Sequence, residues 1–370
     1  MEQRRIRMTS ALNGVSLSQE DIIKQRKLES TVGKYMPDKC AYCLKPFSGN
    51  KKHICNSHSI PQFVLRNIGS DLCGINSLIN MPWHKKETGL KKSGVFCMLH
   101  ADCDNTVFST YENAEIYTND ITESKKIDQI CNEIALKNYL NCLYDINNAL
   151  LIIDYTLEHL PEDRDHLLSR FMQDKKVEEA NLKDIKDRVQ RTRYLQKRAM
   201  KGKPMGDEYS IGFCHVYDRQ FPIATQCRVS PDFDCWGNKI NDSHNLESRI
   251  QDIHICVFPL LDKTFVMAFS RTEDTSISKT FQSIRSLDDY DLVAKALISM
   301  AIYGSQNFFF SASLPSSVTE NQFLREIADD NGTIATFVGA GEEMPTSFGG
   351  TADTSLLSDY ARIPNELIAL

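Results

Sequence analysis

The sequence predicts an α+β protein that begins with a zinc-organised module and continues through a helical middle into an α+β C-terminal domain. Three observations lead to this fold class. Six of the twelve cysteines and four of the nine histidines lie before residue 104. Apolar residues then recur at three- and four-residue steps from about Thr122, which is helical spacing. Short segments rich in β-branched and aromatic residues follow residue 205.

The composition is that of an ordinary globular protein. The chain has 370 residues, of which 41% are hydrophobic and 25% charged. No apolar run reaches the roughly 20 residues of a membrane span, and no apolar segment follows the charged N-terminus as in a secretory signal. We therefore expect a cytoplasmic protein with no membrane partner. A reducing cytosol disfavours disulfides, so the clustered Cys and His residues are predicted to be metal ligands.

Shifts in composition divide the chain into five predicted regions. These are an N-terminal extension (1–38), the zinc module (39–120), a helical region (121–204), an α+β C-terminal domain (205–331) and a tail, rich in Gly, Thr and Ser, that we expect to be partly flexible (332–370).

Within these regions the periodicity predicts individual elements. Two long helices are expected from Thr122 to about Leu160 and from Pro161 to about Met200, because Leu160-Pro161 interrupts the pattern. After residue 205, the predicted strands are Tyr209–Tyr217, Ile253–Pro259 and Lys263–Ser270, followed by a helix over Asp291–Tyr303 and a core or strand segment at Phe308–Phe310.

Two pairs of residues have the spacing of zinc ligands. Cys40 and Cys43 are three positions apart, as are His100 and Cys103, and the second pair leads directly into a helical pattern. Two such pairs supply the four corners of a tetrahedral structural zinc site, and their order is that of a treble clef. Cys55 or Cys97 remains an alternative ligand, and buried, metal-free cysteines are the alternative to any metal site.

The residues between the two pairs resemble the HNH (ββα-metal) nucleases. In that family a strand with a "DHxxP"-like motif carries the general base, and Ser57-His58-Ser59-Ile60-Pro61 matches it. The likeness is closer to bacterial proteins with an "SHSI" strand followed by a "C/H-x2-H/C-D-x3-F-x3-E" helix, which Asp104, Phe108 and Glu112 reproduce. Similar C-terminal patterns extend the resemblance over most of residues 40–315.

The resemblance implies a catalytic set. His58 would be the general base, and Asp104 with Glu112 would hold Mg²⁺ or Mn²⁺, since residues two helical turns apart share a face. Two positions depart from the family, because Ser57 precedes the base and the helix lacks the usual histidine. The alternatives are a structural or zinc-binding His58, a helix N-terminal acid at Asp104 and an ordinary surface carboxylate at Glu112.

Positive charge is concentrated in two blocks of the sequence. Met1–Thr110 carries 16 Lys/Arg against 9 Asp/Glu, and Lys183–Lys203 carries 9 against 2. Two basic blocks favour an anionic partner, with nucleic acid the first candidate. The alternative is a solvated helix face. The expected nucleic-acid contacts in the second helix are Lys186, Arg188, Arg191, Arg193, Lys197 and Arg198.

These observations predict a divergent HNH-like, metal-dependent nuclease that hydrolyses phosphodiester bonds of DNA or RNA. Its cofactors would be a structural Zn²⁺ and a catalytic Mg²⁺ or Mn²⁺. A role in bacterial, including antiviral, defence would fit the resemblance, and the helical region could bind a protein partner or a second copy of the chain. The alternative function is a non-catalytic, zinc-stabilised protein that binds nucleic acid or another protein.

Overall fold

A computed structural model describes most of the chain, namely residues 27, 30–47, 54–74, 87–118, 121–124, 126–159, 165–234, 236–242, 245, 247–325 and 362–368. Helices and an antiparallel sheet are both present, which confirms the predicted α+β class. The elements are β1 (Ser57–His58), α3 (Gln62–Asn67), β2 (Asp71–Gly74), β3 (Thr88–Gly89), β4 (Val95–Phe96), α4 (Ala101–Val107), η3 (Ala114–Thr118), η4 (Ile121–Glu123), α5 (Ile127–His159), α6 (Asp165–Ala199), β5 (Tyr209–Tyr217), β6 (Ile223–Val229), β7 (Ile253–Pro259), β8 (Thr264–Arg271), α7 (Thr275–Arg285), α8 (Tyr290–Gly304), β9 (Phe308–Ser311), α9 (Ser316–Thr319) and η6 (Asn365–Leu367).

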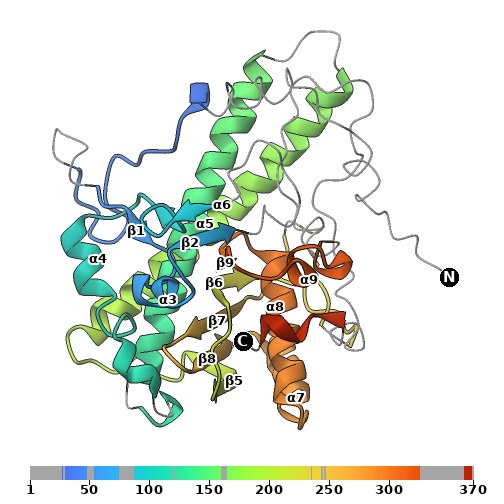
Figure 1. Cartoon of the computed structure of the whole chain (residues 1–370). Coiled ribbons are helices and arrows are strands. Elements are labelled where there is room, and N and C mark those ends of the chain that lie inside the picture. Colours follow the sequence, from blue (N-terminus) through green and yellow to red (C-terminus); the bar gives the residue numbers. More distant parts are fainter. Residues whose placement is uncertain are drawn as a thin grey trace.

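A seven-stranded sheet forms the centre of the protein (Figure 1). Its order is β3-β2-β9-β6-β7-β8-β5, and every neighbouring pair is antiparallel. Two of its strands, β2 and β3, come from the N-terminal region, and Cys73 of β2 pairs with Phe310 of β9. The sheet therefore joins segments more than two hundred residues apart in the sequence.

Each face of the sheet belongs to a different core. On β7, Ile255 and Val257 pack with α7 and α8, whereas Cys256 and Phe258 pack with α5 and the N-terminal segments. Successive side chains of a strand point to opposite faces, so a strand covered on both sides is apolar at almost every position. This explains why β7 appears in the sequence as a continuous apolar run.

The predicted strands agree closely with the structure. β5 and β7 have the predicted bounds, β8 begins one residue later than expected, and the phenylalanine run forms β9. Strand β6 and helix α7 were not predicted. Helix α7 packs tightly on β5, because a Cβ atom added at Gly212 would lie 2.1 Å from the Phe281 ring. Glycine at this position therefore allows the close approach.

Helices α5 and α6 lie side by side, and their distal ends extend beyond the sheet (Figure 1). Their presence confirms the two predicted long helices. Side chains buried between them form hydrogen bonds, as where Asn132 Nδ2 donates to Gln196 Oε1 over 3.0 Å. The first half of α5 is buried on all sides, from Ile130 to Leu140. This half of α5 carries residues of the candidate site.

The chain ends are described only in part. Most of the N-terminal extension and of the predicted flexible tail lies outside the described residues. Within the tail, Ile363 and Leu367 are buried against the α7–α8 face of the sheet. Among the helices that the structure describes, none combines the length and apolarity needed to cross a membrane.

Candidate functional site

The first ligand pair lies on a tight turn. The Cys40 amide donates to the Lys45 carbonyl over 3.0 Å, and the Leu44 amide donates back to the Cys40 carbonyl over 2.9 Å. Leu44 has a φ of 64°, which is uncommon for a residue with a side chain. The turn places Cys40 and Cys43 on the same side, and the Ala41 amide donates to the Met98 carbonyl, which brings the turn beside the second pair.

The second pair lies at the start of a helix. His100 is the N-cap of α4, and Cys103 follows in the first turn. An isolated antiparallel bridge pairs His100 with Ile54 and fixes the backbone before the helix. The Phe47 ring packs against the imidazole of His100, with 4.6 Å between ring centres.

These two pairs come together as the sequence predicted. The ligand atoms of Cys40, Cys43, His100 and Cys103 all lie within 4.8 Å of one another, and Cys43 Sγ is 3.4 Å from His100 Nδ1. Zinc bonds of about 2.0–2.3 Å place tetrahedral ligands about 3.5 Å apart. The pKa of Cys103 is raised to about 12, mainly by burial and secondly by the nearby charge of Cys40. A cation would relieve this repulsion between thiolates, so the group fits a zinc ion.

The two alternative cysteine ligands lie apart from this group. Cys55 Sγ is 3.1 Å from the hydroxyl of Ser57, and Cys97 Sγ donates to Asn56 Oδ1 over 3.2 Å. Neither belongs to the described cluster that could hold a metal. In the described part of the chain, the group that could hold a metal therefore consists of the four residues with the paired spacing.

Asp104 and Glu112 meet at one buried ammonium group. Lys137 of α5 places its Nζ atom 2.7 Å from Asp104 Oδ1 and 3.1 Å from Glu112 Oε1. The lysine side chain is 0% exposed, whereas the carboxylates are 19% and 33% exposed. We call these three side chains the carboxylate cluster. The cluster has a formal charge of −1, and the two carboxylates form the part of it that is exposed to solvent.

Only one oxygen of each carboxylate is used. Among the described residues, no hydrogen bond is made by Asp104 Oδ2 or Glu112 Oε2, and the shortest contacts to Lys137 use Oδ1 and Oε1. The Lys137 ammonium also lies 3.9 Å from the centre of the Phe108 ring and forms a cation–π contact with it. Lys137 therefore orients the two carboxylates and leaves one oxygen of each available.

The carboxylate cluster has unusual polar neighbours. Burial raises the pKa of Cys55 to about 11, with the hydrogen bond to Ser57 acting against burial and the nearby charge of Asp104 acting with it. Burial, followed by the charge of Glu112, also raises the pKa of Tyr111. The Tyr111 hydroxyl and Gln226 Oε1 are both buried without a hydrogen-bond partner in the described part of the chain. Gln226 nevertheless lies close enough to lower the pKa of Tyr111 against the effect of burial, so the two side chains form a weak contact with each other.

His58 is held by a backbone acceptor. It lies on β1, which pairs with β4, and its Nε2 atom is 3.1 Å from the Leu90 carbonyl oxygen. A carbonyl only accepts, so the proton of a neutral ring is on Nε2, and Nδ1 carries a free lone pair. Within the described ranges, no hydrogen bond or ion pair links His58 to Asp104 or Glu112. The structure thus joins the two carboxylates through Lys137, whereas the hydrogen bond of His58 goes to the Leu90 carbonyl.

The basic residues of α6 are largely engaged within the protein. Arg188 was expected to contact nucleic acid, and this expectation is wrong. Arg188 is buried and forms an ion pair with Asp252 over 2.6 Å. Arg191 makes a two-bond pair with Glu208, and Arg198 donates twice to the Pro204 carbonyl. Lys186 and Lys197 are exposed. Arg193 donates to the Ala41 carbonyl, which belongs to the turn that carries Cys40 and Cys43 (residues 39–46, called the zinc turn below).

Asp252 lies at the centre of a second buried ionic group. Arg228 and Ser230 donate to Asp252 Oδ1 over 2.7 and 2.8 Å. The Tyr139 hydroxyl donates to Oδ2 over 3.0 Å, and Arg188 forms an ion pair with the same oxygen over 2.6 Å. We call these five residues the arginine network. Burial by itself would raise the pKa of Asp252. The positive charges of Arg228 and then Arg188 outweigh burial and lower this pKa.

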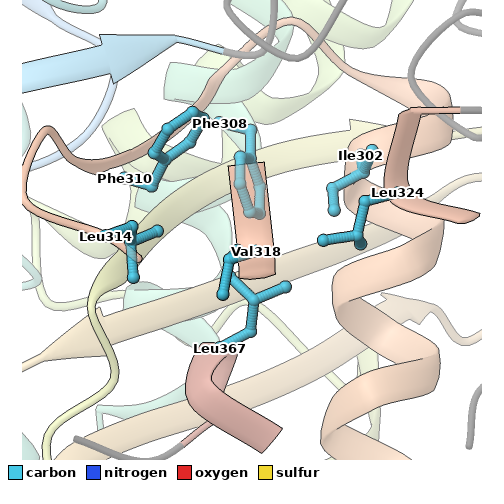
Figure 2. A pocket seen from close by; sticks show the side chains of 7 residues that line it. All are labelled: Ile302, Phe308, Phe310, Leu314, Val318, Leu324 and Leu367. Carbon is cyan, nitrogen blue, oxygen red and sulfur yellow. The ribbon is translucent and has the colours of Figure 1, made fainter. Parts of the chain in front are cut away.

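A small cavity lined by described residues does not offer a site. Its volume is about 10 Å³, and its lining is entirely apolar, as Figure 2 shows with Phe308, Val318 and Leu367 among the side chains. A space of this size holds at most one water molecule, which would find no polar partner there. The polar chemistry lies instead around the zinc ligands and the carboxylate cluster.

Lys137, Tyr111 and Gln226 were missed at the level of sequence. A lysine inside the apolar segment Ile134–Leu140 was the available signal, because a charge among core residues needs a partner. Comparison of the chain with protein-family models, curated proteins and solved structures found no match. The function therefore has to be inferred from the site.

Proposed function

We propose that this protein is a divergent HNH-like nuclease that hydrolyses phosphodiester bonds of DNA or RNA. The observation that carries the proposal is the convergence of Asp104 and Glu112 on Lys137, with both acidic side chains partly exposed to solvent. Oxygen ligands of this kind suit Mg²⁺ or Mn²⁺. The surrounding zinc module would have the treble-clef arrangement, with zinc holding the start of α4 and hence Asp104.

Lys137 supports this function by positioning the carboxylates. Two acids brought together without a cation would repel each other, and one of them would tend to take up a proton. The buried ammonium offsets part of this repulsion and leaves the cluster with a formal charge of −1, which still attracts a divalent cation. A bound Mg²⁺ or Mn²⁺ would supply Lewis-acid stabilisation of charge on the phosphate.

His58 supplies the proton acceptor. Because its Nε2–H is held by the Leu90 carbonyl, the imidazole presents Nδ1 as a base in a fixed orientation. A water molecule that loses its proton to Nδ1 would attack phosphorus while the P–O bond to the leaving sugar oxygen breaks, and that oxygen would take up a proton from solvent. The proposal requires substrate and metal to lie between this nitrogen and the outer oxygens of the cluster.

A cleavage assay tests the proposal. The full chain is incubated with plasmid DNA or RNA and Mg²⁺ or Mn²⁺, and compared with His58→Ala, Asp104→Asn and the matched control Glu158→Gln, an exposed acid on α5. We expect metal-dependent cutting that falls by about a hundredfold or more in the first two variants. All variants should retain bound zinc. Absence of cutting by the wild type with either metal would exclude the nuclease.

One observation favours the alternative of a non-catalytic, zinc-stabilised binding protein. Lys137 already neutralises part of the carboxylate charge, as in a purely structural ion pair, and Ser57 contacts Cys55 where the family usually has a metal ligand. If the wild type binds nucleic acid but cuts none, and Asp104→Asn alters only stability, this second function replaces the first.

A further inference from the structure

The zinc turn and the C-terminal end of α6 form a single surface, although they lie about 150 residues apart in the sequence. Arg193 donates to the Ala41 carbonyl, and the Tyr42 hydroxyl donates to Met200 Sδ over 3.1 Å. Lys197 Nζ lies 5.7 Å from the centre of the Tyr42 ring. These three contacts place the end of the helix directly beside the ligand pair Cys40 and Cys43.

Both segments lack acidic residues. The sequence contains no Asp or Glu between Asp38 and Asp71, and none between Asp187 and Asp207. Lys39 and Lys45 are exposed on the zinc turn, and Lys197 and Lys201 are exposed at the helix end. Since each of the two stretches carries basic but no acidic side chains, the fold joins them into a region of concentrated positive charge.

The same surface exposes apolar side chains. Tyr194 is 54% exposed, and Leu44 and Met200 are each 46% exposed. The guanidinium of Arg198 lies 5.9 Å from the centre of the Tyr194 ring, and its Nη1 donates to the tyrosine hydroxyl. An exposed ring supported by an arginine and flanked by lysines has the composition of surfaces that bind unpaired bases and their phosphates.

We propose that this surface, made of Lys39, Lys45, Tyr194, Lys197 and Lys201, is a docking site for single-stranded nucleic acid. The lysines contact phosphates, and a base stacks on Tyr194. The inference rests on the nucleic-acid substrate of the proposed function, but it does not depend on catalysis. It differs from the set expected from the sequence, because Arg188 is buried and Arg191 is paired with Glu208.

Binding without cleavage tests the site. Fluorescence anisotropy of a labelled single-stranded oligonucleotide is measured over a range of salt concentrations, with no divalent cation present. The wild type should bind with a steep salt dependence, at about −0.7 in log–log slope for each phosphate contacted. Lys197→Glu/Lys201→Glu should weaken binding at least tenfold and reduce the slope. Lys176→Glu/Lys279→Glu makes the same change of charge at two exposed sites elsewhere and should have little effect.

The base-stacking part is tested separately. Tyr194→Ala should weaken binding by about fivefold or more, whereas Tyr194→Phe should retain most of it. The docking site would be overturned if Lys197→Glu/Lys201→Glu and Lys176→Glu/Lys279→Glu weakened oligonucleotide binding equally. It would also be overturned if the wild type did not bind the oligonucleotide at low salt. Tighter binding of duplex than of single strands, with Tyr194→Ala unaffected, would overturn the single-strand assignment. Because no metal is present, failure of the nuclease proposal leaves these outcomes unchanged.

Discussion

The two buried ionic groups of this protein differ in how completely their carboxylates are satisfied. In the arginine network, Asp252 Oδ1 accepts two hydrogen bonds, and Oδ2 accepts one and forms an ion pair with Arg188. The carboxylate side chain is 1% exposed. In the carboxylate cluster, Asp104 and Glu112 each use one oxygen and remain partly exposed. A saturated buried carboxylate holds elements together, whereas an oriented carboxylate with an unused oxygen can bind something else.

The two groups also depend on different supports. The carboxylate cluster receives Asp104 from α4, which begins at the zinc ligand His100, while the arginine network lies between α5, α6 and strands of the main sheet. Loss of zinc should therefore disrupt the carboxylate cluster and leave the arginine network intact. The following five predictions proceed from the largest expected effect to the smallest.

Loss of zinc should separate the two groups most clearly. Cys43→Ser is expected to abolish zinc binding and the order of α4, since structural zinc contributes directly to the folding of small modules. Hydrogen exchange should become fast at α4 but stay slow on β7. The matched variant Cys55→Ser should keep one zinc ion per chain. Retention of zinc in Cys43→Ser would show that the ligand set is different.

Asp252→Ala should be the most costly carboxylate substitution. It leaves Arg188 and Arg228 buried without their shared partner, and breaking such a pair costs about 3–5 kcal/mol of unfolding free energy. Asp104→Ala should cost much less, because its side chain is partly exposed. Urea unfolding of both variants measures the difference. Equal costs would contradict the distinction between a saturated and an open group.

The arginine network should make stability depend on pH through His254. Burial, aided by the charges of Arg228 and Arg188, lowers the pKa of His254 from 6.5 to about 3. The unfolded chain therefore binds a proton that the folded chain does not, and unfolding free energy should fall as pH decreases below 6.5. The limiting slope is about 1.4 kcal/mol per pH unit.

Urea unfolding between pH 6.5 and 5 tests this slope while most carboxylates stay ionised. His254→Gln should flatten it, whereas His159→Gln, at the exposed end of α5, should leave it unchanged. An unaltered slope in His254→Gln would assign the pH dependence to other groups.

Lys137→Met should convert the carboxylate cluster into a stronger cation site. Without the ammonium, the two acids repel each other, so we expect a loss of about 2 kcal/mol that Mn²⁺ partly restores. Thermal unfolding with and without Mn²⁺ measures the recovery. Lys175→Met, which removes an exposed partner of Asp154, should show no such response. Equal Mn²⁺ effects in the two variants would argue against a cation site at Asp104 and Glu112.

Arg191→Ala should have the smallest effect. Its pair with Glu208 is half exposed on the arginine side, and such surface pairs contribute about 0.2–1 kcal/mol. Nucleic-acid binding should also be almost unchanged, because this side chain lies outside the proposed docking surface. A large loss of binding would show that the basic face of α6 extends further along the helix.

Local patterns predicted most individual elements and the zinc ligands. Periodicity located α5, α6, β5 and β7 because the burial of one face or of both faces imposes a spacing on apolar residues. The zinc ligands were recognisable because two residues on a tight turn and two at a helix start need the same short spacing. Strand β6 and helix α7 were missed, and so was the inclusion of β2 and β3 in the main sheet, which depends on pairing with β9.

By itself, the sequence determined which residues could bind zinc and where positive charge is concentrated. The expectation that Asp104 and Glu112 share one helix face was wrong, because α4 ends at Val107 and Glu112 lies in the turn that follows. Only the tertiary structure decided that Lys137 comes from another helix to join those acids, that Arg188 turns inward to Asp252, and that the zinc turn meets the end of α6. The reason is physical. Spacing along a helix or turn is a local property, whereas the partner of a buried charge depends on the packing of distant segments.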